Sequence, residues 1–165
     1  MDSRKGRLVA RRKRETGGSD VAPRRRGVLA TGFSWLLVIA WAAVIFSMSA
    51  QQSTGLSSGF TGQVREVAVG FLALLGLAPD SFSVICHFAE YLVFGALLAN
   101  AFSCRLGLGK SFLLALACAS VYGAGDEFHQ YFVPTRMCDP LDWLTDTLGA
   151  ALGSFACVLA LRRRR

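Results

Sequence analysis

The longest uncharged stretch of the chain, Gly27 to Val64, constrains its fold more than any other feature. These 38 residues carry no charge, and the run from Ser34 to Phe46 is almost continuously apolar. About 20 apolar residues span the hydrocarbon core of a bilayer, so residues 29–49 are predicted to form a transmembrane helix. Small residues at 47–50 would suit a signal peptidase, but two tryptophans and a long basic leader favour an uncleaved anchor.

Three further apolar segments reach the length of a span only if each includes acidic residues at one end. They cover residues 84–104, 110–127 and 141–161. Before them, a Gly/Ser/Thr-rich loop at 51–63 leads into about 13 apolar residues that end near Asp80, too few to cross a membrane. We expect an interfacial helix there, or a cap over the bundle. The predicted fold is therefore all-α, a polytopic integral membrane helical bundle of about four transmembrane helices plus a short interfacial helix.

Basic residues are distributed in a way that orients these four spans. Of the 18 Lys and Arg residues, ten lie in residues 1–26, a segment that carries +7, and the rest of the chain sums to zero. Four spans would place Arg105, Lys110 and the arginines at 162–165 on the same side as that leader, so sixteen basic residues share one side. By the positive-inside rule this side is cytoplasmic. We therefore predict a multi-pass cell-membrane protein with cytoplasmic N- and C-termini.

Composition excludes several other classes of protein. With 53% hydrophobic and 18% charged residues, the chain is a poor candidate for a disordered tail or a nucleic-acid module. The five cysteines contain no CxxC pair, so we interpret them as apolar core residues, with a Cys86–Cys138 disulfide as the alternative. We expect a disordered basic leader at 1–26, a transmembrane domain at 27–161 and a basic tail at 162–165.

Nine ionisable residues in or beside the apolar segments fall toward the outer ends of the predicted spans. Ionisable groups at membrane depth are costly and usually face a bundle interior or a wet cavity, so they are functional candidates by default. No charged residue falls at mid-membrane, which weakens the alternative of a small transporter. The residues are His87 and Glu90 in the second span, Asp126, Glu127 and His129 in the third, and Arg136, Asp139, Asp142 and Asp146 around the start of the fourth.

Helical spacing gathers many of these residues into two stripes. One stripe consists of His87, Glu90, Tyr91 and Phe94, and the other of Asp139, Asp142, Asp146, Gly149 and Gly153. The second stripe ends in a GxxxG pattern, whose small residues let a neighbouring helix approach closely. We expect this approach to bring polar groups of the partner helix against the aspartates.

The residues alone leave three interpretations of this polar cluster open: a metal or catalytic site, a binding pocket without chemistry, and a structural network. Two histidines with four or five carboxylates can hold a divalent cation such as magnesium, calcium, manganese or zinc, with Asp126, Glu127 and His129 as candidate ligands. The same groups can supply an acid and a base for hydrolysis or transfer. Otherwise the cluster is a binding pocket without chemistry, or a structural network in which Arg136 and His129 neutralise nearby aspartates. No HExxH, P-loop or GxGxxG motif decides between them.

Three ordered motifs resemble the VanZ-like membrane protein family. They are HFAEY at His87–Tyr91, DEFHQYFVPTR at Asp126–Arg136 and DWLTDTLGAALG at Asp142–Gly153, and FSMSAQQ at Phe46–Gln52 is similar to the family's opening. The resemblance covers residues 33–160. It implies a small bacterial polytopic membrane protein, and the family's founding member is associated with low-level resistance to the glycopeptide teicoplanin, whose target lies outside the membrane.

Carried over position by position, the resemblance implies a set of polar site residues. We expect a catalytic pocket formed by His87, Glu90, Asp126, Glu127, His129 and Arg136. The expected binding residues are Gln130, Asp142 and Asp146. In an enzymatic version Glu127 or His129 acts as the base and Arg136 holds an anionic group. The chain departs from many relatives at Ser83 and Val84, where they carry a basic pair, and at Asp146, where others have Asn. We expect Asp139 to be peculiar to this chain, and it ranks below Asp142.

The predicted function is that of a cell-envelope protein with an outward-facing acidic, His and Arg pocket. This pocket would act on or shield an outer-leaflet or cell-wall component, and the resemblance suggests a link to glycopeptide resistance. The alternative is a non-enzymatic membrane binding or assembly module whose polar network is structural. Expected partners are the lipid bilayer and a lipid-linked or cell-wall precursor, and not nucleic acid, while the sequence leaves the substrate, the metal and the oligomeric state open.

Overall fold

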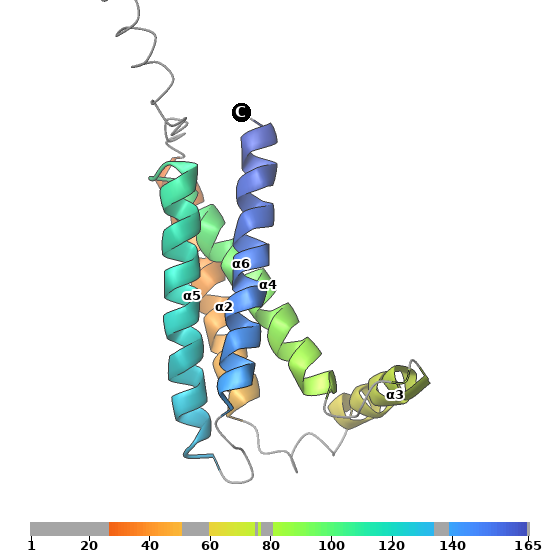
Figure 1. Ribbon diagram of the computed structural model, residues 1–165. Coiled ribbons are helices and arrows are strands. Elements are labelled where there is room, and N and C mark those ends of the chain that lie inside the picture. Colours follow the sequence, from red (N-terminus) through yellow and green to blue (C-terminus); the bar gives the residue numbers. More distant parts are fainter. Residues whose placement is uncertain (1–26, 51–59, 75, 77–80, 134–138, 165) are drawn as a thin grey trace, which may run out of the picture.

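A computed structural model of the protein describes residues 27–50, 60–74, 76, 81–133 and 139–164, and within these ranges it contains helices and no strand (Figure 1). The helices are α2 (Val28–Ser49), α3 (Phe60–Leu74), α4 (Ser81–Ser103), α5 (Leu108–Gln130) and α6 (Pro140–Arg163). All except α3 are long and apolar enough to cross a membrane. The prediction of an all-α membrane bundle with about four spans and one shorter helix is confirmed.

The helices extend past several ends of the predicted apolar segments. α4 begins at Ser81 rather than Val84, and α5 continues beyond Glu127 to Gln130. An α-helix makes its backbone hydrogen bonds within itself, so it can continue past the end of an apolar run. The start of α6 is instead set locally, because Asp139 is its N-cap residue and accepts a 2.9 Å hydrogen bond from the N–H of Leu141.

The four long helices alternate in direction, as Figure 1 shows. The start of α2, the turn between α4 and α5, and the end of α6 all lie at one end of the bundle (Figure 1). Arg105, Lys110 and Arg162–Arg164 therefore share that end, which is the distribution that an even number of spans predicts. Residues 1–26 and Cys138 lie outside the described residues, and with them the expected disordered leader and the alternative Cys86–Cys138 disulfide.

α4 and α6 form the closest helix pair, because glycines let their backbones touch. A Cβ added at Gly149 would lie 2.5 Å from the carbonyl oxygen of Phe88. At Gly153 a Cβ would collide with the carbonyl oxygen of Leu92, and at Gly95, on the facing side of α4, it would collide with the α6 backbone. The GxxxG pattern of the fourth span thus makes the close approach that the sequence predicts.

α2 and α5 are joined to this pair by side chains that donate to backbone carbonyls of neighbouring helices. Tyr122 Oη donates a 2.8 Å hydrogen bond from α5 to the carbonyl oxygen of Ala42 in α2. Trp41 Nε1 donates a 2.9 Å bond from α2 to the carbonyl oxygen of Glu90 in α4. Trp143 makes a comparable bond from α6 to α5. Bonds of this kind are a main source of helix association in lipid, where no hydrophobic force drives helices together.

α3 lies beside the bundle and not over it (Figure 1). Among the described helices it contacts α4 alone, so the alternative of a cap over the bundle is wrong. It also begins at Phe60, inside the segment predicted to be a loop. Val67, Phe71 and Leu74 are exposed, and an exposed apolar face on a helix too short to span fits an interfacial helix.

The outer faces of the long helices present large apolar side chains to the surroundings. Exposed examples are Leu36 and Ile39 on α2, Leu113 and Val121 on α5, and Leu152 and Phe155 on α6. Cys118 is exposed on α5, whereas Cys104 is buried. The interpretation of all cysteines as core residues is therefore wrong for Cys118, because it lies on a face of α5 that none of the described helices covers.

Candidate functional site

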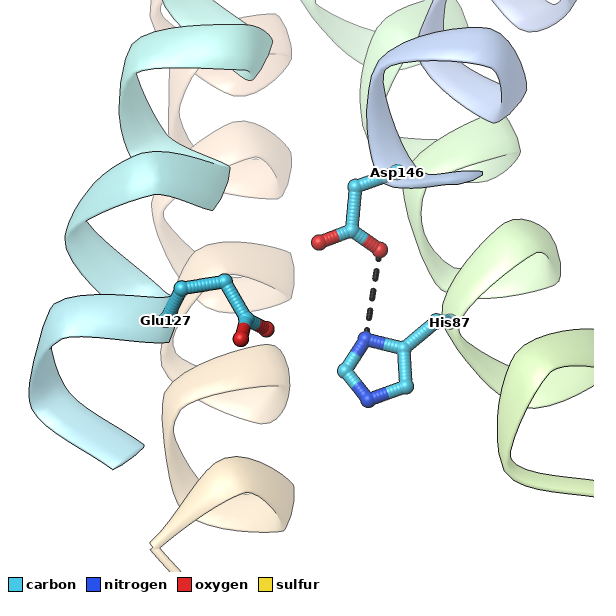
Figure 2. Close-up of side chains that lie close together, drawn as sticks. All are labelled: His87, Glu127 and Asp146. Carbon is cyan, nitrogen blue, oxygen red and sulfur yellow. Dashed lines mark hydrogen bonds and ion pairs between the residues drawn. The ribbon is translucent and has the colours of Figure 1, made fainter. Parts of the chain in front are cut away.

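Three ionisable side chains from three helices meet near the end of the bundle opposite Arg105, Lys110 and Arg162–Arg164. They are His87 on α4, Glu127 on α5 and Asp146 on α6, and Figure 2 shows Glu127 extending toward the other two. His87 Nδ1 and Asp146 Oδ1 are 3.2 Å apart and share a hydrogen bond. One potential ligand atom of each residue lies within 4.8 Å of the others. Relative exposures of 7%, 4% and 0% place the cluster inside the protein.

The helix pairing explains why these side chains meet. His87 is the seventh residue of α4 and Asp146 the seventh of α6, so both lie at a similar depth below their helix starts. Gly149 follows Asp146 by about one helical turn and contacts Phe88, the neighbour of His87. The backbone contact between α4 and α6 therefore brings the imidazole and the carboxylate within hydrogen-bonding distance.

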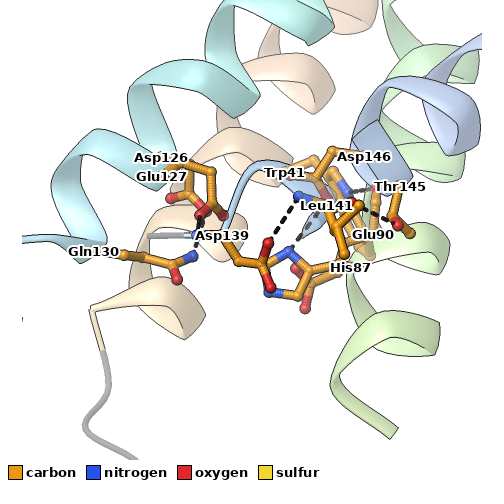
Figure 3. Close-up of polar contacts among 10 residues, drawn as sticks. All are labelled: Trp41, His87, Glu90, Asp126, Glu127, Gln130, Asp139, Leu141, Thr145 and Asp146. Atoms are coloured by element: carbon orange, nitrogen blue, oxygen red, sulfur yellow. Dashed lines mark hydrogen bonds and ion pairs between the residues drawn. The ribbon is translucent and has the colours of Figure 1, made fainter. Parts of the chain in front are cut away.

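The backbone of Asp139 positions the side chain of Glu127. The Asp139 N–H donates a 2.9 Å hydrogen bond to Glu127 Oε2, while the Asp139 side chain caps α6 (Figure 3). The N-terminus of a helix carries partial positive charge, which favours a carboxylate at this place. The sequence ranks Asp139 low as a site residue, and its contribution through the backbone is one that a side-chain motif does not reveal.

Five buried polar atoms in and around the cluster have no hydrogen-bond partner among the described residues. They are Asp146 Oδ2, Glu127 Oε1, Asp126 Oδ1, His129 Nδ1 and Tyr91 Oη. A Cβ added at Gly123 would lie 3.4 Å from both Asp146 Oδ2 and Tyr91 Cε1, so both side chains pack against the same position of α5. The sequence places Tyr91 on the His87 stripe but does not assign it to the site. Unsatisfied groups in a protein interior usually mark a place for water, an ion or a ligand.

Asp126 and His129 lie outside the group formed by His87, Glu127 and Asp146, and the metal set expected from sequence stays a prediction. Asp126 is buried and accepts a 3.2 Å hydrogen bond from Gln130 Nε2. The His129 ring packs on Phe46, with ring centroids 4.6 Å apart, and forms no ion pair with Asp126. Successive helical residues point about 100° apart, which follows from 3.6 residues per turn, so Asp126 and His129 lie on one side of α5 and Glu127 on another.

The remaining predicted site residues lie around the cluster or outside the described ranges. Glu90 and Asp142 are half-buried, one helical turn from His87 and Asp146 respectively. Figure 3 shows Glu90 on the same helix as His87, with Trp41 bonded to its backbone carbonyl. Arg136 lies outside the described residues, so its expected pairing with Asp139 or Asp142 and its expected hold on an anionic group stay predictions.

Family membership is settled by comparison with known families. The family model for VanZ/LLP1 matches residues 33–161. The chain belongs to the VanZ/LLP1 family. This confirms the resemblance inferred from the sequence motifs, and the VanZ/LLP1 match runs from within α2 into α6, so it includes His87, Glu127 and Asp146. No curated protein and no solved structure gives a significant match to the chain.

The arrangement of this VanZ/LLP1 site defines what it can do chemically. A carboxylate bonded to an imidazole nitrogen orients the ring and fixes its tautomer, which prepares the ring to exchange a proton. The nearby Glu127 carboxylate supplies a second acceptor. One nitrogen and two carboxylate donors also form a ligand set suited to a divalent metal ion.

Proposed function

We propose that this protein is a bacterial cell-envelope protein that acts on, or shields, a component of the outer leaflet or the cell wall. The observation that carries the proposal is the buried His87, Glu127 and Asp146 cluster, which draws on three membrane helices. Charged and polar groups at membrane depth are retained where they serve a function. Family membership supports a role in the envelope, with altered glycopeptide sensitivity as its expected consequence.

An outward-facing cluster is part of this proposal and is supported by charge. Arg105, Lys110 and Arg162–Arg164 lie at the bundle end opposite the cluster (Figure 1). Because basic residues flanking spans remain in the cytoplasm, that end is assigned to the cytoplasm and the cluster to the outer leaflet. A lipid-linked precursor or a lipid headgroup would then be the ligand within reach.

In the proposed mechanism, His87 is the proton-transfer group and Asp146 holds it in position. Glu127 provides a second carboxylate whose Oε1 has no partner among the described residues. These roles differ from the sequence-based assignment, in which Glu127 or His129 acts as the base, because His129 packs on Phe46 instead.

The functional test compares envelope phenotypes in a bacterial strain that lacks its own copy of the protein. Wild type, Asp146→Asn and Glu127→Gln are expressed at equal levels, and teicoplanin sensitivity and outer-leaflet lipids with wall precursors are measured. We expect the wild-type protein to alter teicoplanin sensitivity, the outer-leaflet lipids or the wall precursors. We expect strains with either variant to resemble the strain that lacks the protein. Tyr131→Phe, at an exposed position, is the control and retains it. Variants that act like wild type would refute a working role for the cluster.

A structural assembly module is the second candidate, and one observation favours it. Asp146 lies one turn before Gly149, at the contact that joins α4 and α6, so its bond to His87 also fastens these helices. Failure of Asp146→Asn to insert or to remain folded would support this candidate. Loss of the envelope effect in a folded, inserted Asp146→Asn variant would support the first.

A further inference from the structure

We propose that His87, Glu127 and Asp146 bind one divalent transition-metal ion, with zinc as the ion tested. This site differs from the ligand set expected from sequence, with which it shares only Glu127. The inference rests on the proposed function for what the site acts on, with His87 and Asp146 serving as metal ligands in place of the proton-transfer pair, while the binding itself is measured without reference to any activity. The metal site is supported by the spacing of two donor atoms, by a third donor atom without a partner among the described residues, and by the charge of the cluster.

The spacing of His87 Nδ1 and Asp146 Oδ1 matches two ligands of one tetrahedral ion. Zinc bonds to His nitrogen and carboxylate oxygen are about 2.0–2.2 Å long, so two such donors at tetrahedral angles lie roughly 3.3–3.6 Å apart. The two atoms are 3.2 Å apart. An ion can therefore replace the proton that they share with almost no movement of α4 or α6.

Glu127 supplies the third donor from the facing helix. Its Oε1 is buried and has no partner among the described residues, and Figure 2 shows the carboxylate directed toward the other two side chains. Donors to one zinc ion cannot lie more than about 4.4 Å apart. One ligand atom of Glu127 lies within 4.8 Å of those of His87 and Asp146, so a small rotation of the Glu127 side chain brings it into range. The bond from the Asp139 N–H to Oε2 orients this carboxylate as outer hydrogen bonds do in metal sites.

The charge of the cluster favours a cation. Glu127 and Asp146 are buried carboxylates, and within the described ranges the cationic group that pairs with either of them is His87. Burying unneutralised carboxylates in a membrane protein is costly. A divalent ion balances two carboxylates and leaves the imidazole neutral, as metal ligation requires. Three protein ligands also leave a fourth position for water or a ligand group, as in catalytic zinc sites.

The test is metal binding by the purified full-length chain in lipid nanodiscs. The protein is stripped with a chelator and then titrated with Zn²⁺ by calorimetry, and with Co²⁺, whose visible spectrum reports tetrahedral coordination. We expect one ion per chain. We expect Asp146→Asn and Glu127→Gln to bind at least about 10–100-fold more weakly, the loss that follows removal of even an outer hydrogen-bond partner of a metal ligand.

Asp126→Asn is the matched control. Asp126 is a buried carboxylate adjacent to Glu127 in sequence and is bonded to Gln130, outside the proposed ligand group. This variant should retain one ion, and the metal-free forms of all variants should elute and melt as folded protein. Absence of stoichiometric binding in the wild type, or equal loss in Asp126→Asn, would overturn the proposal.

The same experiments separate this inference from the proposed function. A wild-type protein that binds no ion, yet has an envelope effect that Asp146→Asn abolishes, would refute the metal site and leave the proposed function standing. A bound ion that is lost in Asp146→Asn, together with no envelope effect in any strain, would establish the metal site and refute the proposed function.

Discussion

The imidazole of His87 and the carboxylate of Asp146 are hydrogen-bonded at 3.2 Å although 59 positions separate them in sequence. Their helices are in backbone contact at Gly149 and Gly153, so the bond and the glycine contact depend on the same packing. The stability of the α4–α6 pair and the geometry of the polar cluster are therefore coupled, and each can be tested separately by substitution.

The first prediction concerns the His87–Asp146 bond. With a chelator present, His87→Ala and Asp146→Ala should each lower the free energy of unfolding by about 1–3 kcal/mol, because each leaves the other buried group unpaired. The double variant should lose less than the sum, with a coupling of about 0.5–3 kcal/mol. Thermal unfolding in detergent measures all four proteins, and strictly additive losses would contradict the bond.

The second prediction concerns the glycine contact. Gly153→Ala should destabilise the protein by about 1–3 kcal/mol, the usual cost of overpacking, because its Cβ meets the backbone of Leu92. Gly125→Ala is the control, since nothing lies within 4 Å of a Cβ at that position. The thermal midpoint and the yield of monodisperse protein report the difference. Equal stability of the two variants would show that α4 and α6 are farther apart.

The third prediction concerns the start of α6. Asp139→Ala removes the cap on the Leu141 N–H and should cost about 0.5–2 kcal/mol, whereas Asp139→Asn should retain most of the stability. Hydrogen exchange in the first turn of α6 should accelerate in the alanine variant alone. Identical exchange in Asp139→Ala and the wild type would rule out the cap.

The fourth prediction concerns the bond between α5 and α2. Tyr122→Phe removes the hydroxyl that donates to Ala42 and should cost about 0.6 kcal/mol, up to about 1.7 kcal/mol, as for other interhelical bonds in membranes. Tyr131→Phe, at an exposed position, should cost nothing. Differential scanning fluorimetry of both variants checks this, and a Tyr131→Phe loss as large as that of Tyr122→Phe would refute it.

The fifth prediction concerns topology. In a background with the five native cysteines replaced, Ser53→Cys and Thr135→Cys should react with a membrane-impermeant thiol reagent added to intact cells. Arg162→Cys should react only after the cells are permeabilised, because basic residues that flank spans stay inside. Protection of Thr135→Cys with labelling of Arg162→Cys would reverse the orientation of the bundle and place the cluster in the cytoplasmic leaflet.

Much of the fold could be predicted because the signals that determine it are local. The charge-free run around Ser34–Phe46 is long enough to define one span by length alone. The close approach at Gly149 and Gly153 follows from two small residues one turn apart. The place of α3 could not be predicted, because a short apolar helix can lie on a membrane or on a bundle, and only its contact with α4 decides.

The site could be predicted only as a set of residues. Helical spacing places His87 and Asp146 each on a polar stripe, but it does not state which carboxylate the imidazole reaches. On α5, the choice between Asp126 and Glu127 depends on how that helix is rotated against α4 and α6. Tertiary packing fixes this rotation, and it directs Glu127 inward to the cluster while Asp126 bonds to Gln130.

The backbone contact between α4 and α6 gives the cluster a fixed half and an adjustable half. His87 and Asp146 belong to two helices that are in contact through glycines. If these helices slid past each other, the Cβ atoms of other residues would meet the backbone carbonyl groups that the glycines now face. Glu127 belongs to α5, which meets its neighbours through side chains, and its carboxylate accepts one hydrogen bond from the N–H of Asp139, the N-cap residue of α6. A shift of α5 against that bond therefore alters the distance from Glu127 to the pair, while the glycine contact keeps His87 and Asp146 together.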